Sequence, residues 1–427
     1  MKLLIISSEP LNPDNTFSSI FELNQAKALQ KNGFQVSILA VKNDYSLDRV
    51  LKLIIRRLFK KKSNDKSLSK DSIYQLIKKS FIACLNIFLK YKLPVEIYCI
   101  QNIPVYEAKV RYIKAKDNFS NLKQWKRAAA AGFLSYCKDG GVPELIHARN
   151  RYLFAGAFAF DLYKKYKLPY VLTEHSSFYR RGLVKPADIP VLKDSIENSR
   201  RFIIVNPNLR IDIEQIIGKP LAPTEYVPNL LDEVFLSELP SKRIKKEFVF
   251  INVASLVPIK GHKYLLEAFA RVIKVNQLAR LIIIGDGPLI YDLKNTVEKL
   301  KINKNVEFLG QLNTLNIVNF LDYADVFVLS SIYETFGVVV LEALVRGKPI
   351  VITKCGGSEI FWDKENGLIV NVEDSKALEV AMIKIMNDID KYNSASIRNN
   401  ILKEYNPDLI SKKLEGIYRG SLTTKQH

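Results

Sequence analysis

The chain of 427 residues has few cysteines, few histidines and no long hydrophobic run. Its four cysteines, Cys84, Cys99, Cys137 and Cys355, show no metal-ligand spacing, so one or more of them are expected to serve as small buried apolar residues. No stretch of uncharged apolar residues is long enough to span a membrane. The apolar run within Met1–Ser8 is too short for a signal peptide and predicts a buried strand instead. We therefore expect a protein of the reducing cytoplasm.

Acidic residues are also scarce, since 44 Asp and Glu face 64 Lys and Arg and leave a net charge of +20. A charge of this size indicates an anionic partner, but nucleic acid, an anionic membrane and an anionic substrate all fit it. Hydrophobic residues make up 48% of the chain. This is enough for two α/β domains with separate cores.

Much of the positive charge lies in an insertion, Arg49–Lys92, whose only acids are Asp65 and Asp71. Apolar residues recur at helical spacing in Arg49–Lys60 and again from Ile73 to Phe88, with basic residues on the opposite side of the first segment. Two interpretations stay open: these amphipathic helices lie on an anionic membrane surface, or they pack on the domain with their lysines in water. Few aromatic residues and no binding module make nucleic acid the weaker partner.

The pattern of elements alternates strand and helix. In the first half, strands are predicted at Lys2–Ser7, Val36–Ala40, Glu96–Ile100, Glu144–Ala148, Tyr170–Thr173 and Phe202–Val205, with a helix at Phe21–Lys31 and a basic segment from Ile100 through Arg127. In the second half, strands are predicted at Phe248–Val253, Leu281–Ile284, Val306–Leu309, Val326–Leu329 and Val351–Thr353, and helices at Tyr264–Val275, Leu378–Asn387 and Leu409–Tyr418. This alternation predicts parallel α/β sheets.

One stretch, Ser331–Pro349, organises the second half. It follows the apolar run Val326–Leu329, a predicted interior strand, and leads into a helix predicted from Gly337 to Arg346. The loop between them lies at the carboxyl edge of the sheet, where ligands bind and free helix N–H groups point. Glu334 in the loop and Glu342 in the helix offer carboxylates that accept hydrogen bonds from hydroxyl groups. Together these features indicate a phosphorylated polyol such as a nucleotide sugar.

Glu334 and Glu342, with seven residues between them, also resemble a family signature. The pair looks like the E-x7-E motif of the family 4 retaining glycosyltransferases of the GT-B fold, of the bacterial cell-envelope polysaccharide type. The letters ETFG from Glu334, EA at Glu342 and GKP at Gly347–Pro349 fall in the same register. The resemblance implies two Rossmann-like domains facing each other across a cleft. It also implies retaining transfer of a sugar from a UDP- or GDP-linked donor to a glycan or lipid-pyrophosphate acceptor, with no cofactor and no metal.

The resemblance assigns roles in the second half. Lys260, between a strand and a helix, would contact the donor diphosphate together with the backbone N–H groups of Gly337 and Val338. Glu342 would accept hydrogen bonds from the ribose, and Glu334 from the transferred sugar. Gly285 and Phe336 fall in loops of the same donor site, and so does Ser255, which stands where the family often has an arginine. One expected phosphate cation is therefore missing.

In the first half, two histidines end predicted strands. His147 belongs to His147-Ala148-Arg149, which resembles the sugar-site loop in which H-x-H is common, so Arg149 replaces the second histidine. Arginine can hold a phosphate or carboxylate through two parallel hydrogen bonds. His175 lies in LTEHSS, which resembles the T-x-H motif on the acceptor side. His147, Arg149, His175 and Glu334 are the candidate catalytic residues.

The expected organisation has four parts: an acceptor-side domain at 1–225 that contains the insertion at 49–92, a linker at 226–247, a nucleotide-sugar-binding domain at 248–404, and a last helix at 405–427 that crosses back to the first domain. Two other functions remain open. One is a catalytically silent sugar-nucleotide-binding scaffold, which the altered Arg149 and Ser255 allow. The other is a basic protein that binds a membrane or nucleic acid and merely inherits the fold.

Overall fold

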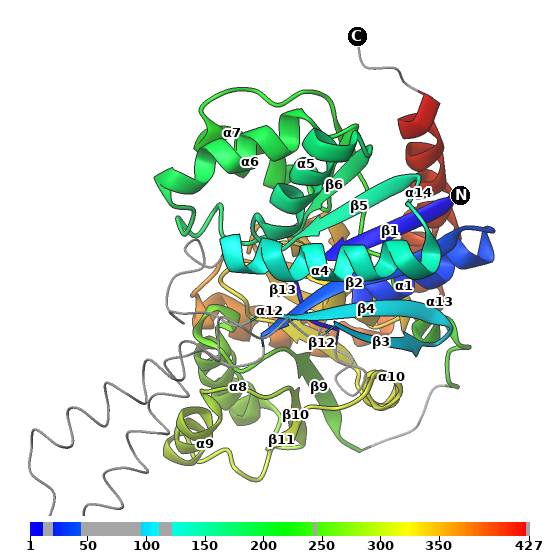
Figure 1. Ribbon diagram of the computed structural model, residues 1–427. Coiled ribbons are helices and arrows are strands. Elements are labelled where there is room, and N and C mark those ends of the chain that lie inside the picture. The colour runs from blue at the N-terminus through cyan, green and yellow to red at the C-terminus, as the bar shows by residue number, and fades with distance from the viewer. Residues whose placement is uncertain (12–19, 44–94, 111–121, 242–245, 424–427) are drawn as a thin grey trace, which may run out of the picture. The chain divides into compact units, whose positions relative to one another are not determined.

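The computed structural model describes residues 1–11, 20–43, 95–110, 122–241 and 246–423 (Figure 1). The predicted basic insertion at 49–92 lies outside these residues. By its internal contacts the described chain divides into two compact units. One holds the residues up to 13 together with 32–172 and 185–200, and the other holds residues 14–31, 173–184 and everything from 201 on. The domain limits expected from the sequence stay predictions.

The first sheet has eight strands in the order β3-β4-β2-β1-β5-β6-β7-β8. These are β1 (Lys2–Ser7), β2 (Gln35–Asn43), β3 (Val95–Ile100), β4 (Ile103–Val110), β5 (Leu145–Asn150), β6 (Tyr170–Glu174), β7 (Arg201–Ile204) and β8 (Thr224–Tyr226). Strand β1 pairs in parallel with β2 and β5, whereas β3 pairs antiparallel with β4 at the edge. All six residues of β5 are buried, as expected for a central strand covered on both faces.

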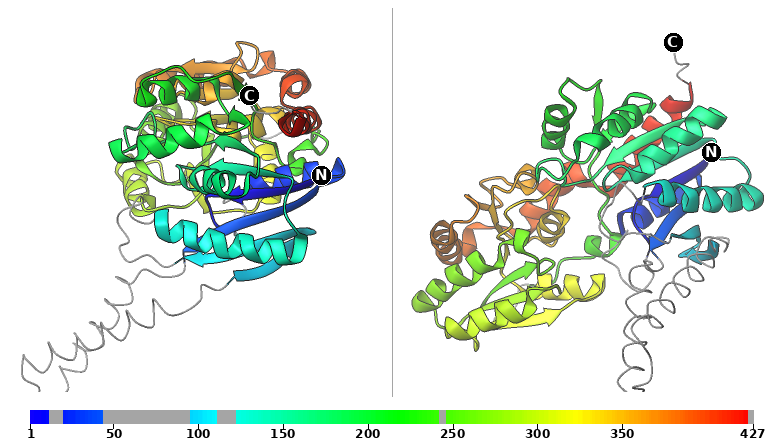
Figure 2. Two further views of the ribbon diagram at one scale, coloured as in Figure 1. Left: turned by 45° about the horizontal axis from the view of Figure 1, so that its top comes forward. Right: turned by 60° about the vertical axis from the view of Figure 1, so that its left-hand side comes forward.

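The helices that follow in the first part of the chain are α1 (Ile20–Lys31), α4 (Leu122–Gly140), α5 (Phe154–Tyr166), α6 (Ile189–Glu197) and α7 (Pro207–Ile217), with short 3₁₀ turns at Pro186–Asp188 and Glu233–Leu236. Helix α4 packs on β4 and β2, and α5 packs on β5. Both views of Figure 2 show α4, in cyan, alongside these strands. Within the segment that the sequence marks only as basic through Arg127, the described residues form β4 and the first residues of α4.

The second sheet has six strands in the order β11-β10-β9-β12-β13-β14. These are β9 (Phe248–Val253), β10 (Ala279–Ile284), β11 (Val306–Gly310), β12 (Val326–Leu329), β13 (Ile350–Thr353) and β14 (Gly367–Val370), and every neighbouring pair is parallel. Phe250 of β9 and Val328 of β12 belong to the core that this sheet buries beneath α8 (His262–Val275) and α12 (Ser375–Asn387). The predicted parallel α/β architecture is confirmed.

The remaining helices are α9 (Ile290–Lys299), α10 (Thr314–Tyr323), α11 (Val338–Val345), α13 (Ser394–Tyr405) and α14 (Pro407–Thr423), and 3₁₀ turns lie at Pro258–Lys260, Ser358–Phe361 and Ile389–Lys391. Helix α14 packs against α1, where the Gln25 side-chain amide donates to the Tyr418 hydroxyl. Among the helices that the structure describes, none combines the length and the apolar character needed to cross a bilayer.

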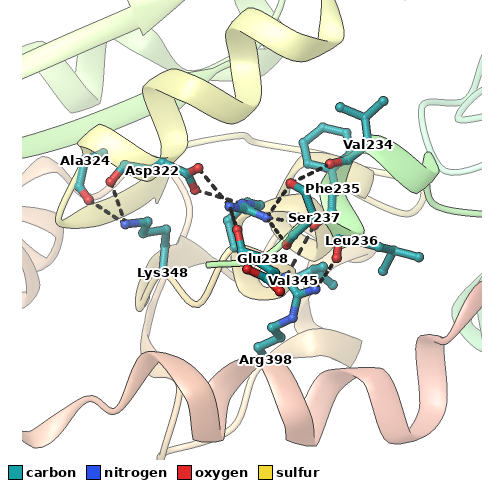
Figure 3. Close-up of polar contacts among 11 residues, drawn as sticks. Val234, Phe235, Leu236, Ser237, Glu238, Asp322, Ala324, Val345, Lys348 and Arg398 are labelled. Carbon is teal, nitrogen blue, oxygen red and sulfur yellow. Dashed lines mark hydrogen bonds and ion pairs between the residues drawn. The ribbon is translucent and has the colours of Figure 1, made fainter. Parts of the chain in front are cut away.

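A buried arginine, Arg346, fixes the carboxyl end of α11. Figure 3 labels its partners Asp322, Phe235, Ser237 and Glu238. Arg346 is 1% exposed, and its guanidinium donates to both carboxylate oxygens of Asp322 at 2.8 Å. The same guanidinium donates to the carbonyls of Phe235, Ser237 and Glu238, which belong to the segment leading into the second sheet. A buried charge needs such full pairing, so this cluster holds α11 in one position.

Candidate functional site

The loop between β12 and α11 lies at the carboxyl edge of the second sheet, as the sequence predicts. Strand β12 ends at Leu329, and α11 begins at Val338 directly after Gly337. Gly337 has φ +75°, and a β-carbon placed on it would lie 2.1 Å from Oγ of Ser358. The loop therefore needs glycine here, because the backbone is left-handed and packs tightly against the loop after β13.

Lys260 and Glu334 meet in this site. The Lys260 ammonium donates to Oε1 of Glu334 at 2.5 Å, and Oγ of Ser331 donates to the same oxygen at 2.7 Å. Lys260 ends the 3₁₀ turn after β9 and precedes Gly261, whose φ of +63° brings its backbone against the Ser330 carbonyl. The loops after β9 and β12 are thus in contact, which joins the predicted phosphate cation to the predicted sugar carboxylate.

Glu342 lies in the second turn of α11 and keeps only partial contact with solvent. Burial, with a smaller contribution from the nearby Asp232 carboxylate, raises the pKa of Glu342 to about 8. The removal of a carboxylate from water disfavours its charged form. The Glu342 carboxyl group is therefore largely protonated at neutral pH, and in that form it can donate as well as accept a hydrogen bond.

The other predicted donor residues are Gly285, Ser255 and Phe336, and they differ in what surrounds them. Gly285 has φ +138°, and a β-carbon on it would lie 1.9 Å from the carbonyl oxygen of Ala254, so it closes the turn after β10. Ser255 is exposed beside that turn. The Phe336 ring is only 4% exposed and packs edge-to-face on Phe361 at 4.9 Å. The Phe336 side chain is thus part of the core, and its contact with the donor stays a prediction.

Two asparagines hold the neighbouring loop after β13, and sequence reasoning missed them. The Asn206 amide donates to the carbonyls of Gly356 and Gly357 at 3.3 and 3.1 Å, and the Asn208 amide donates to that of Gly356 at 3.0 Å. Arg180 lies over the Tyr333 ring, 5.7 Å from its centroid. The Asn-Pro-Asn run at 206–208 marks a helix start, where Asn206 also accepts from the Asn208 N–H.

His147 lies inside β5 with no exposed surface, and its Cα pairs with that of Ile5. Burial, together with the nearby Arg149 charge, lowers the pKa of His147 well below its usual range, so the ring is neutral. A side chain without surface has no direct route to a substrate. This burial favours a structural role for His147, and its catalytic role stays a prediction. Arg149 is 6% exposed at the end of the same strand, level with Ser7 of β1.

His175 follows β6 and is half-buried. The preceding residue organises this turn: Oε1 of Glu174 accepts from the backbone N–H groups of His175 and Ser176 at 3.0 and 2.9 Å, and Oε2 accepts from the Tyr179 hydroxyl at 2.7 Å. Glu174 is fully buried, and the sequence reading gave it no role. Its position directly before the histidine was the available signal.

Two families match the chain. Residues 237–402 match Glycosyl transferases group 1, and residues 94–234 match Glycosyltransferase Family 4. Among curated relatives, the N-acetyl-alpha-D-glucosaminyl L-malate synthase of Bacillus anthracis is 25% identical over 53% of this chain and 61% of its own length. An Escherichia coli UDP-Gal:alpha-D-GlcNAc-diphosphoundecaprenol alpha-1,3-galactosyltransferase is 27% identical over 53% of this chain and 62% of its own length. The aligned part thus spans less than two thirds of either relative.

Solved structures match nearly the whole chain. Sucrose-phosphate synthase from Thermosynechococcus elongatus superposes with a TM-score of 0.74 at 17% identity, covering 98% of each chain. Anabaena HepE in complex with UDP-glucose gives a TM-score of 0.68 at 15% identity, over 98% of this chain and 99% of the other. At such identities these matches establish the fold alone.

Proposed function

We propose that the chain, which matches Glycosyl transferases group 1 and Glycosyltransferase Family 4 in successive parts and has the GT-B fold, transfers a sugar from a UDP- or GDP-linked donor with retention of anomeric configuration. The acceptor is a glycan or a lipid-linked pyrophosphate in surface polysaccharide biosynthesis. The relative from E. coli named for a diphosphoundecaprenol acceptor and the neighbour bound to UDP-glucose support both halves of this proposal. The protein would act in the cytoplasm, peripherally on the inner face of the membrane.

The contact between Lys260 and Glu334 beside the amino end of α11 carries the proposal. Lys260 would hold the donor diphosphate together with the backbone N–H groups of Gly337 and Val338, where the helix dipole favours negative charge. Glu334 would then accept hydrogen bonds from hydroxyl groups of the transferred sugar. These groups supply positive charge without a metal, so the proposal requires none.

Glu342 lies farther along α11 and would bind the ribose. Its raised pKa keeps a proton on the carboxyl group at neutral pH, so one oxygen would donate to a ribose hydroxyl while the other accepts. Hydroxyl groups both donate and accept, which makes them suitable partners for a neutral carboxyl group. The base and the sugar of the donor are left to experiment, because no described contact selects them.

The largest charge change accompanies departure of the nucleoside diphosphate. The bond between the anomeric carbon and the phosphate oxygen would break, and its electron pair would pass to the diphosphate, which Lys260 and the helix N–H groups stabilise. The acceptor hydroxyl would form the new bond on the same face of the sugar. Its proton would pass to the departing phosphate oxygen. Arg149 and His175 would contact the acceptor or the reacting sugar.

The test is a panel of UDP-, GDP- and ADP-sugars, assayed for binding and slow hydrolysis with wild type, Glu342→Ala and the exposed control Glu365→Ala. We expect one donor to bind and be hydrolysed, and only Glu342→Ala to lose that binding. Failure of every nucleotide sugar to bind would refute the proposal.

A catalytically silent sugar-nucleotide scaffold is the second candidate, because exposed Ser255 supplies no phosphate cation where the family often has arginine. Binding of a donor without hydrolysis or transfer to any acceptor would favour it. If Ser255→Arg gives turnover, the missing cation at this position is what prevents sugar transfer in the scaffold.

A further inference from the structure

Helices α4 and α5 pack against each other on the first sheet (Figure 1). Their contact is aromatic: the Trp125 ring stacks on Phe154 with centroids 5.6 Å apart, and Phe133 meets Phe158 at 6.5 Å. At the surface of the seam, Lys126 of α4 forms an ion pair with Asp161 of α5 at 2.7 Å. The two helices therefore present a continuous outer face, which we call the α4–α5 face.

The α4–α5 face is strongly basic. Apart from the acid Asp139, its exposed residues are Lys123, Arg127, Leu134 and Lys138 from α4, and Lys164, Lys165, Tyr166 and Lys167 from the end of α5. On α4 these positions follow one another at steps of four and seven, so they lie on one side of the helix. The acids nearby are Asp139 and Asp161, and Asp161 is already paired with Lys126 and Lys164. The face keeps a clear excess of positive charge.

The placement of these cations on α4 opposes the local preference of a helix. In the described chain α4 begins at Leu122 without an acid in its first turn, and Lys123, Lys126 and Arg127 follow within two turns. The amino end of a helix carries partial positive charge, so cations there are unfavourable for the helix itself. Lys164 and Lys165 at the carboxyl end of α5 and Lys138 in the last turn of α4 agree with the dipole. The cations near the start of the described part of α4 do not. A charge pattern that costs local stability indicates an external partner.

Apolar and aromatic groups are exposed among the charges. Leu134 is 57% exposed and Tyr166 is 47% exposed. The lysine ammonium groups lie over aromatic rings: Lys164 is 4.3 Å from the Phe160 centroid, and Lys165 is 4.8 Å from that of Tyr166. Long basic stems beside tyrosine and leucine suit a bilayer boundary, where apolar groups enter the lipid and cations reach the head groups.

We propose that the α4–α5 face docks on the surface of an anionic phospholipid bilayer. The partner follows from charge complementarity together with the exposed Leu134, because a purely electrostatic partner such as a nucleic acid would leave its side chain without a further apolar contact. The Tyr166 ring stacks on Phe133 with centroids 6.3 Å apart, and only its remaining exposed surface is available to lipid. The inference rests on the proposed function in one respect: docking on the bilayer would bring the protein to a lipid-linked acceptor. The contact is located on described helices and does not depend on the insertion at 49–92.

The first test measures full-length protein sedimenting with phosphatidylcholine vesicles with and without phosphatidylglycerol, in the absence of nucleotide sugar. The variant Lys123→Glu/Arg127→Glu/Lys138→Glu should lose at least about a hundredfold in affinity for the anionic vesicles, since each membrane-proximal cation contributes about fivefold. The control Lys294→Glu/Lys299→Glu/Lys304→Glu makes the same charge change at exposed residues of and after α9, and it should bind like wild type. Equal binding by both variants would overturn the proposal.

A second measurement reports position. Leu134→Trp should shift its fluorescence emission to shorter wavelength with anionic vesicles, whereas Tyr291→Trp, at a position that is 79% exposed on α9, should not. Loss of duplex DNA binding in the α4–α5 variant, with wild type ignoring vesicles, would make the partner nucleic acid and refute the lipid proposal. Vesicle binding by a protein that transfers no sugar would leave this inference standing while the proposed function falls.

Discussion

The ammonium nitrogen of Lys260 lies 2.5 Å from Oε1 of Glu334, although the two residues are 74 positions apart in the chain. The Lys260 side chain is about one-fifth exposed, and that of Glu334 is one-tenth exposed. Ser331 adds a second hydrogen bond to the same carboxylate oxygen. In the proposed reaction Lys260 and Glu334 fix each other's orientation. Substitutions at the two positions should therefore not be additive in their effects on donor binding.

The first prediction follows from this coupling. Lys260→Ala should weaken nucleoside diphosphate binding by about 10- to 100-fold, because it removes one charge-assisted hydrogen bond. Lys260→Arg should retain part of the affinity, since it keeps the charge but changes its geometry. Calorimetric titration with UDP and GDP gives the numbers. Lys263→Ala, an exposed lysine in the same helix α8, is the matched control, and an equal loss in that variant would show that net charge rather than position governs binding.

The raised pKa of Glu342 predicts how stability depends on pH. In the unfolded chain the carboxyl group loses its proton near its ordinary value of 4.5, but in the folded chain it does so only near 8. The unfolded state therefore gains stability relative to the native state as pH rises from 4.5 to about 8. Glu342→Gln, which mimics the neutral form, should melt like wild type at pH 4 and at increasingly higher temperature than wild type up to about pH 8.

Thermal melts of both proteins across that pH range provide the measurement. Glu365→Gln changes an exposed carboxylate, and its melting curve should run parallel to that of wild type. A constant difference between Glu342→Gln and wild type at every pH would mean that packing rather than ionisation sets the effect. In that case the neutral carboxyl group proposed to meet the ribose would have to be abandoned.

Much of the fold could be predicted from apolar runs alone. The intervals Phe248–Val253 and Val326–Leu329 coincide with β9 and β12, because interior parallel strands are buried on both faces and are continuously apolar. Strand β4 was missed, since it contains Pro104, Lys109 and Glu107. Glu107 is only 1% exposed and accepts from the Tyr98 hydroxyl. A charged side chain that is buried and hydrogen-bonded to a neighbouring strand interrupts the apolar pattern from which strands are predicted.

The candidate site also has a part that the sequence predicts and a part that it does not. Lys260, Glu334 and Glu342 could be found because their loop and helix carry a local pattern. The partners that hold them could not: Arg346 pairs with Asp322 and with the carbonyl of Ser237, over 100 residues away. In the sequence, Gly347–Pro349 only falls in register with the family motif, and nothing there predicts a partner for Lys348. In the structure, Lys348 donates to the carbonyls of Asp322 and Ala324 at the end of α10. Tertiary pairing of this kind is invisible to spacing rules.

Arg346 provides the third prediction. Arg346→Ala should lower the free energy of unfolding by about 3–5 kcal/mol, because it leaves the partly buried Asp322 carboxylate without its cation and the carbonyls of Phe235, Ser237 and Glu238 without this donor. Arg346→Lys should recover little, since one ammonium cannot replace the forked set of donors. Urea denaturation measures both. The control Arg419→Ala removes an exposed arginine that pairs with Glu415 one turn away. It should change the free energy of unfolding by less than about 0.5 kcal/mol. An equally small loss for Arg346→Ala would contradict the prediction and show that Arg398, which donates to the Val345 carbonyl, can hold the end of α11 alone.

The last prediction concerns the loop that starts α11. Gly337→Ala should lower the free energy of unfolding by at least about 1–3 kcal/mol through its positive φ, with a further loss from the contact of the new β-carbon with Ser358 Oγ at 2.1 Å. Adding Ser358→Ala should recover part of that loss, so a double-mutant cycle measured by urea denaturation should show favourable coupling. Gly416→Ala lies in α14 with open space around it and should instead stabilise the protein by about 0.5–1 kcal/mol. Additive losses in the cycle would mean that the loops after β12 and β13 move apart to accept the methyl group, and donor binding should then fall even where stability is kept.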